Sequence, residues 1–213
     1  METTIAGHLL VLLPEKALYL VEERMLVIAD AHIGKIEHFR LAGIGVPGHA
    51  GNHTLHKLSQ LITQWQRTAV IFLGDLFHSV RNSSLEKFEE LRKTYPDIPF
   101  HLITGNHDIL SPEQYHQLGL NLMPELIIGN LWLTHEPCAE TVTGCYNIAG
   151  HIHPSVRIKG AGKQSLTFPC FYFSPRNGIL PAFGYFTGKA RLRIEKDSTI
   201  FAIADHKIFK IPV

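Results

Sequence analysis

The stretch Phe100-His-Leu-Ile-Thr-Gly-Asn-His-Asp108 decides the fold, because it joins a short apolar segment to a dense polar cluster. Apolar runs of about four to eight residues that end in glycine are typical of buried strands. Gly105 would end such a strand, and Asn106, His107 and Asp108 would follow it in a tight loop. The stretch therefore predicts a strand that presents chemically active side chains at its carboxyl end.

The same arrangement occurs at four other places in the chain. Helical patterns separate the first three of the five apolar stretches, which predicts crossover helices and a parallel sheet core. In such sheets the ligand site lies outside the carboxyl ends of the strands, so we expect the polar clusters to meet at one edge of the fold. The other four stretches are Met25-Leu-Val-Ile-Ala-Asp-Ala-His32, Ala69-Val-Ile-Phe-Leu-Gly-Asp75, Leu131-Trp-Leu-Thr-His135 and Tyr146-Asn-Ile-Ala-Gly-His-Ile-His153.

Three helices and a second group of strands complete the predicted fold. Residues 52–66 and 84–94 carry apolar side chains at helical spacing. Ser111-Pro-Glu-Gln114 combines a candidate N-cap, a proline at the first helical position and a glutamine three residues after the cap. After His153 the pattern predicts a second, mainly antiparallel sheet within the same domain, so that residues 1–213 form one domain. Its strand-like pieces are 156–158, 166–173, 179–183, 192–194, 200–204 and 208–211.

Composition and charge narrow the class of protein. The chain has 213 residues, with 20 Lys+Arg against 19 Asp+Glu and 45% hydrophobic residues, which is typical of a globular protein with its own core. A formal net charge of +1 gives no global basic field, so nucleic acid would have to bind to a local patch. The three cysteines form no C-x-x-C pair, which argues against a thiolate zinc site. No signal peptide or membrane span is recognised at the amino terminus, so we expect a cytoplasmic protein.

Histidine is the unusual component of the sequence, with 14 copies. The polar clusters combine imidazole with carboxylate and amide groups and contain no sulfur, a set that suits manganese, iron or zinc. Seven ligands are too many for one tetrahedral ion. They suit two ions about 3.5 to 4 Å apart that share a carboxylate, an arrangement that clamps a phosphate during in-line displacement. The seven candidates are Asp30, His32, Asp75, Asn106, His135, His151 and His153.

In this order, Asp-x-His, Gly-Asp, Gly-Asn-His-Asp, an isolated His and Gly-His-x-His resemble the five blocks of the calcineurin-like metallophosphoesterase superfamily. The resemblance spans Asp30 to His153. It implies an α/β fold, a four-layer α/β/β/α sandwich of two mixed sheets flanked by helices. It also implies hydrolysis of phosphoester bonds at a dinuclear metal centre, with metal-activated hydroxide as the nucleophile.

The resemblance implies a role for each candidate. Asp30, His32 and His153 would hold the first metal, and Asp75 would bridge the two metals. His107 would face the leaving-group oxygen as a general acid, since a nearby imidazole provides about 10² to 10⁴ of rate. Asp108 would orient or charge-stabilise His107. The ligands of the second metal would be Asn106, His135 and His151.

Three longer stretches are similar to the bacterial DNA ligase-associated metallophosphoesterases. They are Asp30-Ala-His-Ile-Gly-Lys35, Gly74-Asp-Leu-Phe-His-Ser79 and Leu180-Pro-Ala-Phe-Gly-Tyr-Phe-Thr-Gly188. This branch implies a manganese-dependent DNA endonuclease of DNA repair, for which we expect single-stranded DNA as the favoured substrate. A helicase, a DNA ligase and an exonuclease would be its partners.

Five further side chains are candidates for holding the substrate. Lys35 and Arg40 follow the first polar cluster, Arg81 follows the second, and Arg176 lies in a turn between predicted strands. Each is a backbone-phosphate contact or an ordinary surface charge. His78, three residues beyond Asp75, is either a substrate contact or a plain loop histidine.

Two other functions remain open on the sequence alone. A phosphomonoesterase or small nucleotide phosphodiesterase would use the same metal ligands, because substrate choice lies in the flanking loops. A scaffold that keeps the fold for partner binding would not need the complete ligand set. The presence of all seven ligands and of His107 favours an enzyme.

Overall fold

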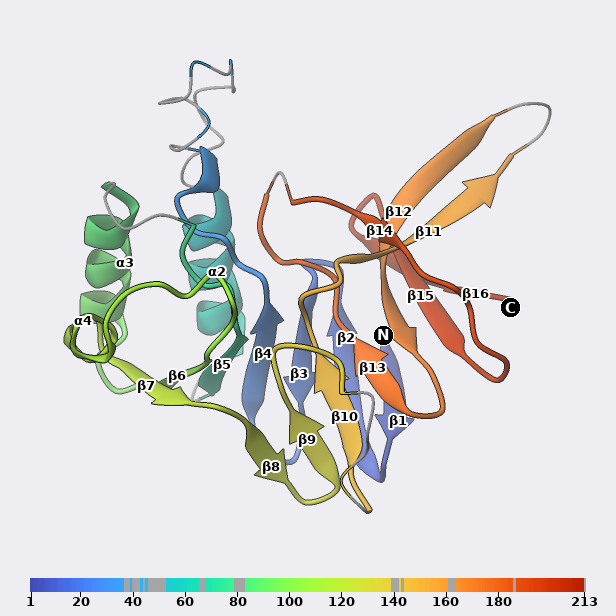
Figure 1. Ribbon diagram of the computed structural model, residues 1–213, viewed down its shortest axis with the longest axis horizontal. Helices are drawn as coiled ribbons and strands as arrows, with labels where there is room; N and C mark the ends of the chain where they lie inside the picture. Colours follow the sequence, from blue (N-terminus) through green and yellow to red (C-terminus); the bar gives the residue numbers. More distant parts are fainter. Residues whose placement is uncertain are drawn as a thin grey trace.

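Two β-sheets face each other in this protein, and its helices gather on one side of them (Figure 1). The computed structural model describes residues 1–36, 39, 43, 45, 53–65, 68–78, 83–138, 142, 144–160, 164–185 and 187–212. Within these residues no helix is long and apolar enough to cross a membrane.

The first sheet has seven strands, which follow one another in chain order. Its first four strands pair antiparallel. From the fourth strand on the pairing is parallel, as the separating helices predicted. The strands are β1 (Glu2–Ile5), β2 (His8–Leu13), β3 (Ala17–Leu20), β4 (Met25–Ala29), β5 (Ala69–Leu73), β6 (Phe100–Ile103) and β7 (Leu120–Met123).

The second sheet has nine strands and is also mixed. Its pairs β10·β13, β10·β9 and β11·β14 are parallel, and the others are antiparallel. The strands are β8 (Leu126–Ile128), β9 (Leu131–Leu133), β10 (Tyr146–Ala149), β11 (Pro154–Lys159), β12 (Ser165–Phe173), β13 (Asn177–Ile179), β14 (Ala190–Arg191), β15 (Thr199–Ala204) and β16 (Lys207–Ile211).

Among the described residues, three helices cover the outer face of the first sheet. They are α2 (His53–Gln64), α3 (Ser83–Thr94) and α4 (Pro112–Gln117), close to the predicted ranges. Leu58 of α2 and Phe88 of α3 pack with Phe72 and Phe100 of the sheet in one buried cluster. At α4 the Ser111 side chain accepts a hydrogen bond from the Gln114 N–H, and the Gln114 side chain accepts one from the Ser111 N–H. This pair of bonds is the expected capping box.

Apolar contacts between the two sheets form the central core. Alternation along the strands divides the first sheet: Ile28 and Phe72 face the helices, whereas Val27 and Ile71 face the second sheet. Phe171 of β12 meets Val27 and Ile71 in that inner core. The α/β class with two mixed sheets is therefore confirmed.

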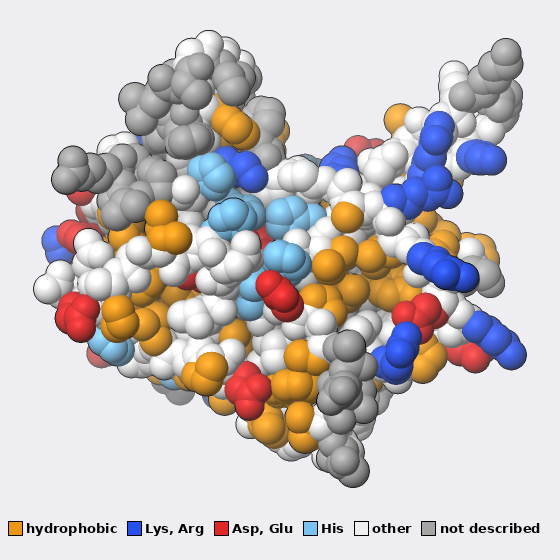
Figure 2. Space-filling model, viewed as in Figure 1, with side chains coloured by type: hydrophobic (Ala, Val, Ile, Leu, Met, Phe, Trp, Pro, Cys, Tyr) orange, Lys and Arg blue, Asp and Glu red, His pale blue; other side chains and the backbone are white. Residues whose placement is uncertain are grey.

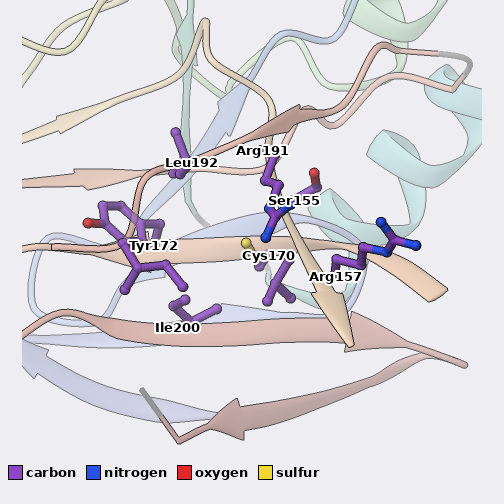
Figure 3. A pocket seen from close by; sticks show the side chains of 9 residues that line it. Ser155, Arg157, Cys170, Tyr172, Arg191, Leu192 and Ile200 are labelled. Atoms are coloured by element: carbon purple, nitrogen blue, oxygen red, sulfur yellow. The ribbon is translucent and has the colours of Figure 1, made fainter. Parts of the chain in front are cut away.

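The outer face of the second sheet is covered differently. In the part of the chain that the structure describes, a non-helical segment with Leu192 packs there on Cys170, Tyr172 and Ile200. A cavity of about 50 Å³ lies at this contact, and Figure 3 shows these four side chains around it. The cavity is lined mainly by apolar side chains and contains none of the metal-ligand candidates.

Two predicted strands are wrong: 192–194 is not a strand, because β14 ends at Arg191, and 179–183 is a strand only at its first residue. β13 ends at Ile179, because Pro181 has no N–H for a ladder. The chain then crosses from one sheet to the other: the Leu180 N–H donates to Ala149 O at 2.8 Å and the Phe183 N–H donates to Ala29 O at 2.8 Å. This buried segment ties the carboxyl ends of β10 and β4 together.

Candidate metal centre

The polar clusters meet at the carboxyl edge of the two sheets, and Figure 2 shows the histidines gathered on this face. The backbone is unusual there. Asp30, His32, Asp75, His151 and His153 have φ between 42° and 64°, the left-handed region that costs non-glycine residues about 1 to 3 kcal/mol each. Such strain persists only where the surrounding structure imposes it. The local folding therefore turns these side chains toward one another instead of relaxing the chain.

The first group of potential ligands consists of Asp30, His32 and His153, whose ligand atoms lie within 4.8 Å of one another. Asp30 is fully buried, and its Oδ2 accepts from the His151 N–H at 2.9 Å. Its Oδ1 lies 3.6 Å from His153 Nε2. Asp30 Oδ1 and His32 Nδ1 are buried and have no hydrogen-bond partner among the described residues. A buried carboxylate oxygen without a partner is costly, and a cation would compensate it.

The second group consists of Asp75, His135 and His151, within the same 4.8 Å limit. His135 Nδ1 lies 2.9 Å from Leu73 O, so this nitrogen carries the proton and Nε2 of the neutral ring carries a lone pair. That lone pair faces Asn106 Oδ1 at 3.0 Å and His151 Nδ1 at 3.1 Å. Oxygen and nitrogen lone pairs that converge in this way fit a bound cation.

Asp75 lies between the two groups. Its Oδ2 is 3.9 Å from His32 Nε2, and its Oδ1 is 3.5 Å from His135 Nε2. The same Oδ1 accepts from the His107 N–H at 3.0 Å. A single carboxylate thus faces both groups, which is the geometry that a shared ligand requires. All seven candidates of the sequence are brought together, and their donor set fits two transition-metal ions.

Burial shapes the electrostatics of the site. It lowers the pKa of His32 to about 2, together with the nearby charge of Lys35. The imidazole of His32 therefore stays neutral and keeps a lone pair available, which is the form that binds metals. Burial also lowers the pKa of Lys35, whereas the negative charges of Asp75 and Asp30 oppose this change by raising it.

Gly74 shows why the sequence needs glycine next to the shared aspartate. Its φ is 73°, and a Cβ added there would collide with the His135 ring. A larger residue would displace that ring from Asn106 and Asp75. The Gly-Asp pair is thus required by the packing of a candidate ligand on the backbone.

His107 and Asp108 differ in what they touch. His107 is exposed, and its ring centroid lies 6.2 Å from that of His32. Asp108 accepts from the N–H groups of Asp75 and Gly105 at 2.8 Å and of Leu76 at 2.9 Å. Burial raises its pKa, and those backbone hydrogen bonds oppose the rise. This corrects the expected catalytic role of Asp108: its carboxylate binds two loops together rather than the ring of its neighbour.

The structure places some of the expected substrate contacts near the metal ligands and others away from them. Lys35 lines a small hollow together with His32 and Tyr185, and the His78 ring lies 5.9 Å from the His32 ring. Arg40 and Arg81 lie outside the described residues. The expectation that Arg176 contacts the substrate is wrong. This residue precedes β13, at the end of the strand away from the metal ligands, and pairs with Glu195 at 3.3 Å.

Two residues near the site were missed in the sequence. Tyr185 is 46% exposed beside His32, and only its place in the quoted 180–188 stretch could have indicated it. Lys57 is half-buried, and its ammonium group donates to Phe183 O at 2.7 Å while lying 3.6 Å from the Phe183 ring centroid. Since the next residue, Gly184, donates to Asp30 O at 3.0 Å, Lys57 supports the backbone of a candidate ligand.

A third group of potential ligands, His8, Glu22 and Glu23, lies elsewhere. The two glutamates precede β4, at the end of that strand opposite Asp30. His8 Nδ1 and Glu23 Oε1 lie 2.7 Å apart and satisfy each other as a hydrogen-bonded pair. This group therefore stands apart from the edge where the five polar clusters meet.

Comparisons with known proteins place this chain in a family. Among solved structures, the nuclease MPE of Pseudomonas putida is similar over 99% of both chains, with 27% sequence identity and a TM-score of 0.81. A protein of unknown function from Aquifex aeolicus is 18% identical over 65% of this chain and 82% of that chain, with a TM-score of 0.42. The comparison with curated proteins gave no match. The model of the calcineurin-like phosphoesterase family matches residues 23–173. With its two ligand groups at one strand edge, the chain therefore belongs to the calcineurin-like phosphoesterase family and is a metal-dependent hydrolase of phosphoester bonds.

Proposed function

We propose that this protein is an endonuclease of DNA repair that cleaves phosphodiester bonds in single-stranded DNA with two manganese ions. The observation that carries the proposal is the position of Asp75 between two ligand groups, 3.9 Å from His32 and 3.5 Å from His135. The similarity over 99% of both chains to a protein described as a nuclease supports a nucleic acid as the substrate. The three stretches that resemble the DNA ligase-associated branch support the link to repair.

Each side chain has a defined task in this proposal. Asp30, His32 and His153 hold one ion, and Asp75 is shared with the other. The remaining ligands are Asn106, His135 and His151. When bound, the two ions supply Lewis-acid charge at the phosphate and lower the pKa of a water to the neutral range. The buried hydrogen bonds of Asp30 and His135 fix the directions of these ligands before any ion arrives.

His107 is proposed to hand a proton to the leaving oxygen. It is exposed beside the ligand groups, and its backbone N–H is fixed by Asp75 Oδ1 at 3.0 Å. An imidazole there gives its ring proton to the departing alkoxide, which is a poor leaving group at neutral pH without one. Asp108 positions this loop through its three backbone hydrogen bonds.

Lys35, His78 and Tyr185 are proposed to contact the substrate. Lys35 and Tyr185 line the hollow beside His32. There the Lys35 ammonium group contacts a phosphate, and the Tyr185 ring stacks on a base. A flexible single strand can bend to bring one phosphate to the metal ligands, most of which are buried, whereas a stiff duplex cannot do so without distortion. The repair helicase, ligase and exonuclease partners and the cytoplasmic location stay predictions.

Cleavage of a circular single-stranded DNA tests the proposal. The purified chain with manganese is expected to linearise the circle, and Asp75→Ala is expected to leave it intact. Release of phosphate from nucleotides is measured in parallel. If nucleotides turn over while the circle survives, the protein is a phosphomonoesterase or nucleotide phosphodiesterase instead. If neither substrate nor a chromogenic phosphodiester is hydrolysed at full metal occupancy, the scaffold alternative holds.

A further inference from the structure

A long stretch without acidic residues follows the last candidate ligand. Residues 154–194 contain seven Lys or Arg and no Asp or Glu. The rest of the chain therefore has 13 Lys+Arg against 19 Asp+Glu, a formal charge of −6. The net charge of +1 conceals this division. A local basic patch of the kind that nucleic acid requires is thus present in the sequence.

This stretch builds a hairpin that projects from the body of the molecule, as β11 and β12 show in Figure 1. Lys and Arg side chains gather along the hairpin in Figure 2, to one side of the histidines. Arg157 and Lys159 of β11 are exposed, as is Arg191 of the neighbouring β14. Arg157 and Arg191 border the cavity, and Figure 3 shows the Arg157 guanidinium directed away from Tyr172.

The register places these cations on one face. Arg157 lies opposite Thr167, and Lys159 lies opposite Ser165, in the antiparallel pair β11·β12. Arg191 lies opposite Ser155 in the pair β11·β14. Directly opposed residues share a face of a sheet. We name the exposed cations of this face, Arg157, Lys159 and Arg191, the hairpin cations.

The same face continues into the core between the sheets. Thr167 alternates along β12 with the same parity as Phe171 and Phe173, which pack against the first sheet. Cys170 and Tyr172 have the other parity and point to the outer side. By this parity the hairpin cations lie on the strand face that is continuous with the inner core, and Arg157 and Arg191 also border the cavity beside Cys170 and Tyr172.

Backbone connections link the hairpin to the metal centre. β11 begins directly after His153, and the Ala190 N–H next to Arg191 donates to His153 O at 3.0 Å. At about 3.3 Å per strand residue, Arg157 and Lys159 lie about 13 and 20 Å along the strand from His153. This length matches about four to six phosphates of a stacked strand, at about 3.4 Å each.

Two further features suit a phosphate backbone. The Arg157 side chain donates two of its hydrogen bonds to Ser165 Oγ, at 2.9 and 2.6 Å, which orients the guanidinium and leaves other donors of the same group for a ligand. Ser165 and Thr167, which carry hydroxyl groups, lie opposite Lys159 and Arg157 on the same face. Arginine, lysine and hydroxyl side chains are the usual contacts of DNA phosphates.

We propose that the hairpin cations bind the phosphate backbone of the DNA strand whose scissile bond lies at the metal centre. This inference rests on the proposed function, which it deepens by naming a surface that holds the substrate away from the reacting atoms. Because phosphate contacts carry no sequence information, the surface binds any sequence.

The test compares two triple variants. Arg157→Gln, Lys159→Gln and Arg191→Gln together remove the hairpin cations, and Lys93→Gln, Lys207→Gln and Lys210→Gln remove the same charge from exposed positions on α3 and β16. Both are made in the metal-loaded protein carrying His107→Ala, and anisotropy of a labelled single-stranded oligonucleotide measures affinity across a salt series. The hairpin variant should bind about tenfold or more weakly, and the dependence of log affinity on log salt should fall by about 2, since each lost contact contributes about 0.7. The control variant should bind within about twofold of its parent, because its charges lie off the DNA path.

Activity of the same variants with native His107 separates the two ideas. The hairpin variant should lose kcat/KM on single-stranded DNA and keep full turnover of bis(p-nitrophenyl) phosphate, a substrate too small to reach the hairpin. Equal weakening of DNA binding in both triple variants would overturn the inference. It would also be overturned if the hairpin variant lost affinity only for RNA or only for phosphatidylserine vesicles. If the native chain binds DNA through the hairpin but cleaves neither circular nor linear DNA, the surface stands and the endonuclease proposal fails.

Discussion

The ligand edge and the projecting hairpin contribute to the same proposed reaction by opposite physical means. At the ligand edge, side chains such as Asp30 and His32 are buried, their backbone is strained, and their atoms converge on points. On the hairpin, Arg157 and Lys159 are exposed on a regular strand and are spaced along a line. A reaction at phosphorus needs fixed atoms, whereas a polyanion needs distributed charge. Changes at the edge should therefore reduce turnover of every substrate, and changes on the hairpin should reduce only turnover of long ones.

The largest effect is expected at Asp75. Asp75→Ala removes the carboxylate that faces both ligand groups, so metal occupancy and turnover should fall together, by more than the 10- to 100-fold typical of outer partners of metal ligands. Metal analysis of the purified variant and hydrolysis of bis(p-nitrophenyl) phosphate measure the two losses. Retention of two ions per chain would contradict the shared position of this aspartate.

His107→Ala should act on rate alone. The variant keeps the backbone N–H that donates to Asp75, so both ions should stay bound while turnover falls about 10²- to 10⁴-fold. The loss should be larger for an alkyl leaving group than for nitrophenol, which departs without a proton. Equal losses on both substrates would argue against a proton donor at this position.

Asp108→Asn separates positioning from chemistry. The amide has one acceptor oxygen in place of two, so it cannot accept from the N–H groups of Asp75, Leu76 and Gly105 together. Metal affinity should weaken about 10- to 100-fold, and the loss of rate should not depend on the leaving group. A leaving-group dependence like that of His107→Ala would restore a direct catalytic role to this carboxylate.

Lys57→Met should have the smallest effect, on stability. The change leaves the buried Phe183 carbonyl without its donor, which should cost about 1 kcal/mol in free energy of unfolding. Burial lowers the pKa of Lys57 to about 7 from 10.5, so within that window the unfolded chain holds a proton that the folded chain has released. Stability from Lys57 therefore increases with pH across this range. Urea unfolding of both proteins should show a deficit that grows from pH 7 to pH 9, and a constant deficit would place the ammonium outside the buried segment.

The two regions also differ in how far the sequence predicts them. The strands β4, β5 and β6 could be predicted from the sequence, because each apolar run ends abruptly in residues that suit metals. The left-handed backbone at Asp30 and Asp75 was not, since it depends on hydrogen bonds from distant loops. Asp108 was misjudged for the same reason: three of its partners are backbone N–H groups, which carry no sequence signal.

The strands of the hairpin were predicted, but the hairpin cations were missed because charge was counted over the whole chain. These cations come from β11 and β14, which are far apart in sequence and become neighbours only through strand pairing. Arg176, in contrast, was chosen for its place in a turn, and the topology puts that turn at the other end of β13. Counting charge along sliding windows would have indicated residues 154–194, but not the face on which they lie.

Anomalous scattering from a crystal grown with ample manganese would show directly whether two ions share Asp75. We expect two manganese peaks about 3.5 to 4 Å apart, one beside Asp30, His32 and His153 and one beside His135 and His151, with the Asp75 carboxylate touching both. A single peak, or two peaks without Asp75 between them, would contradict this expectation.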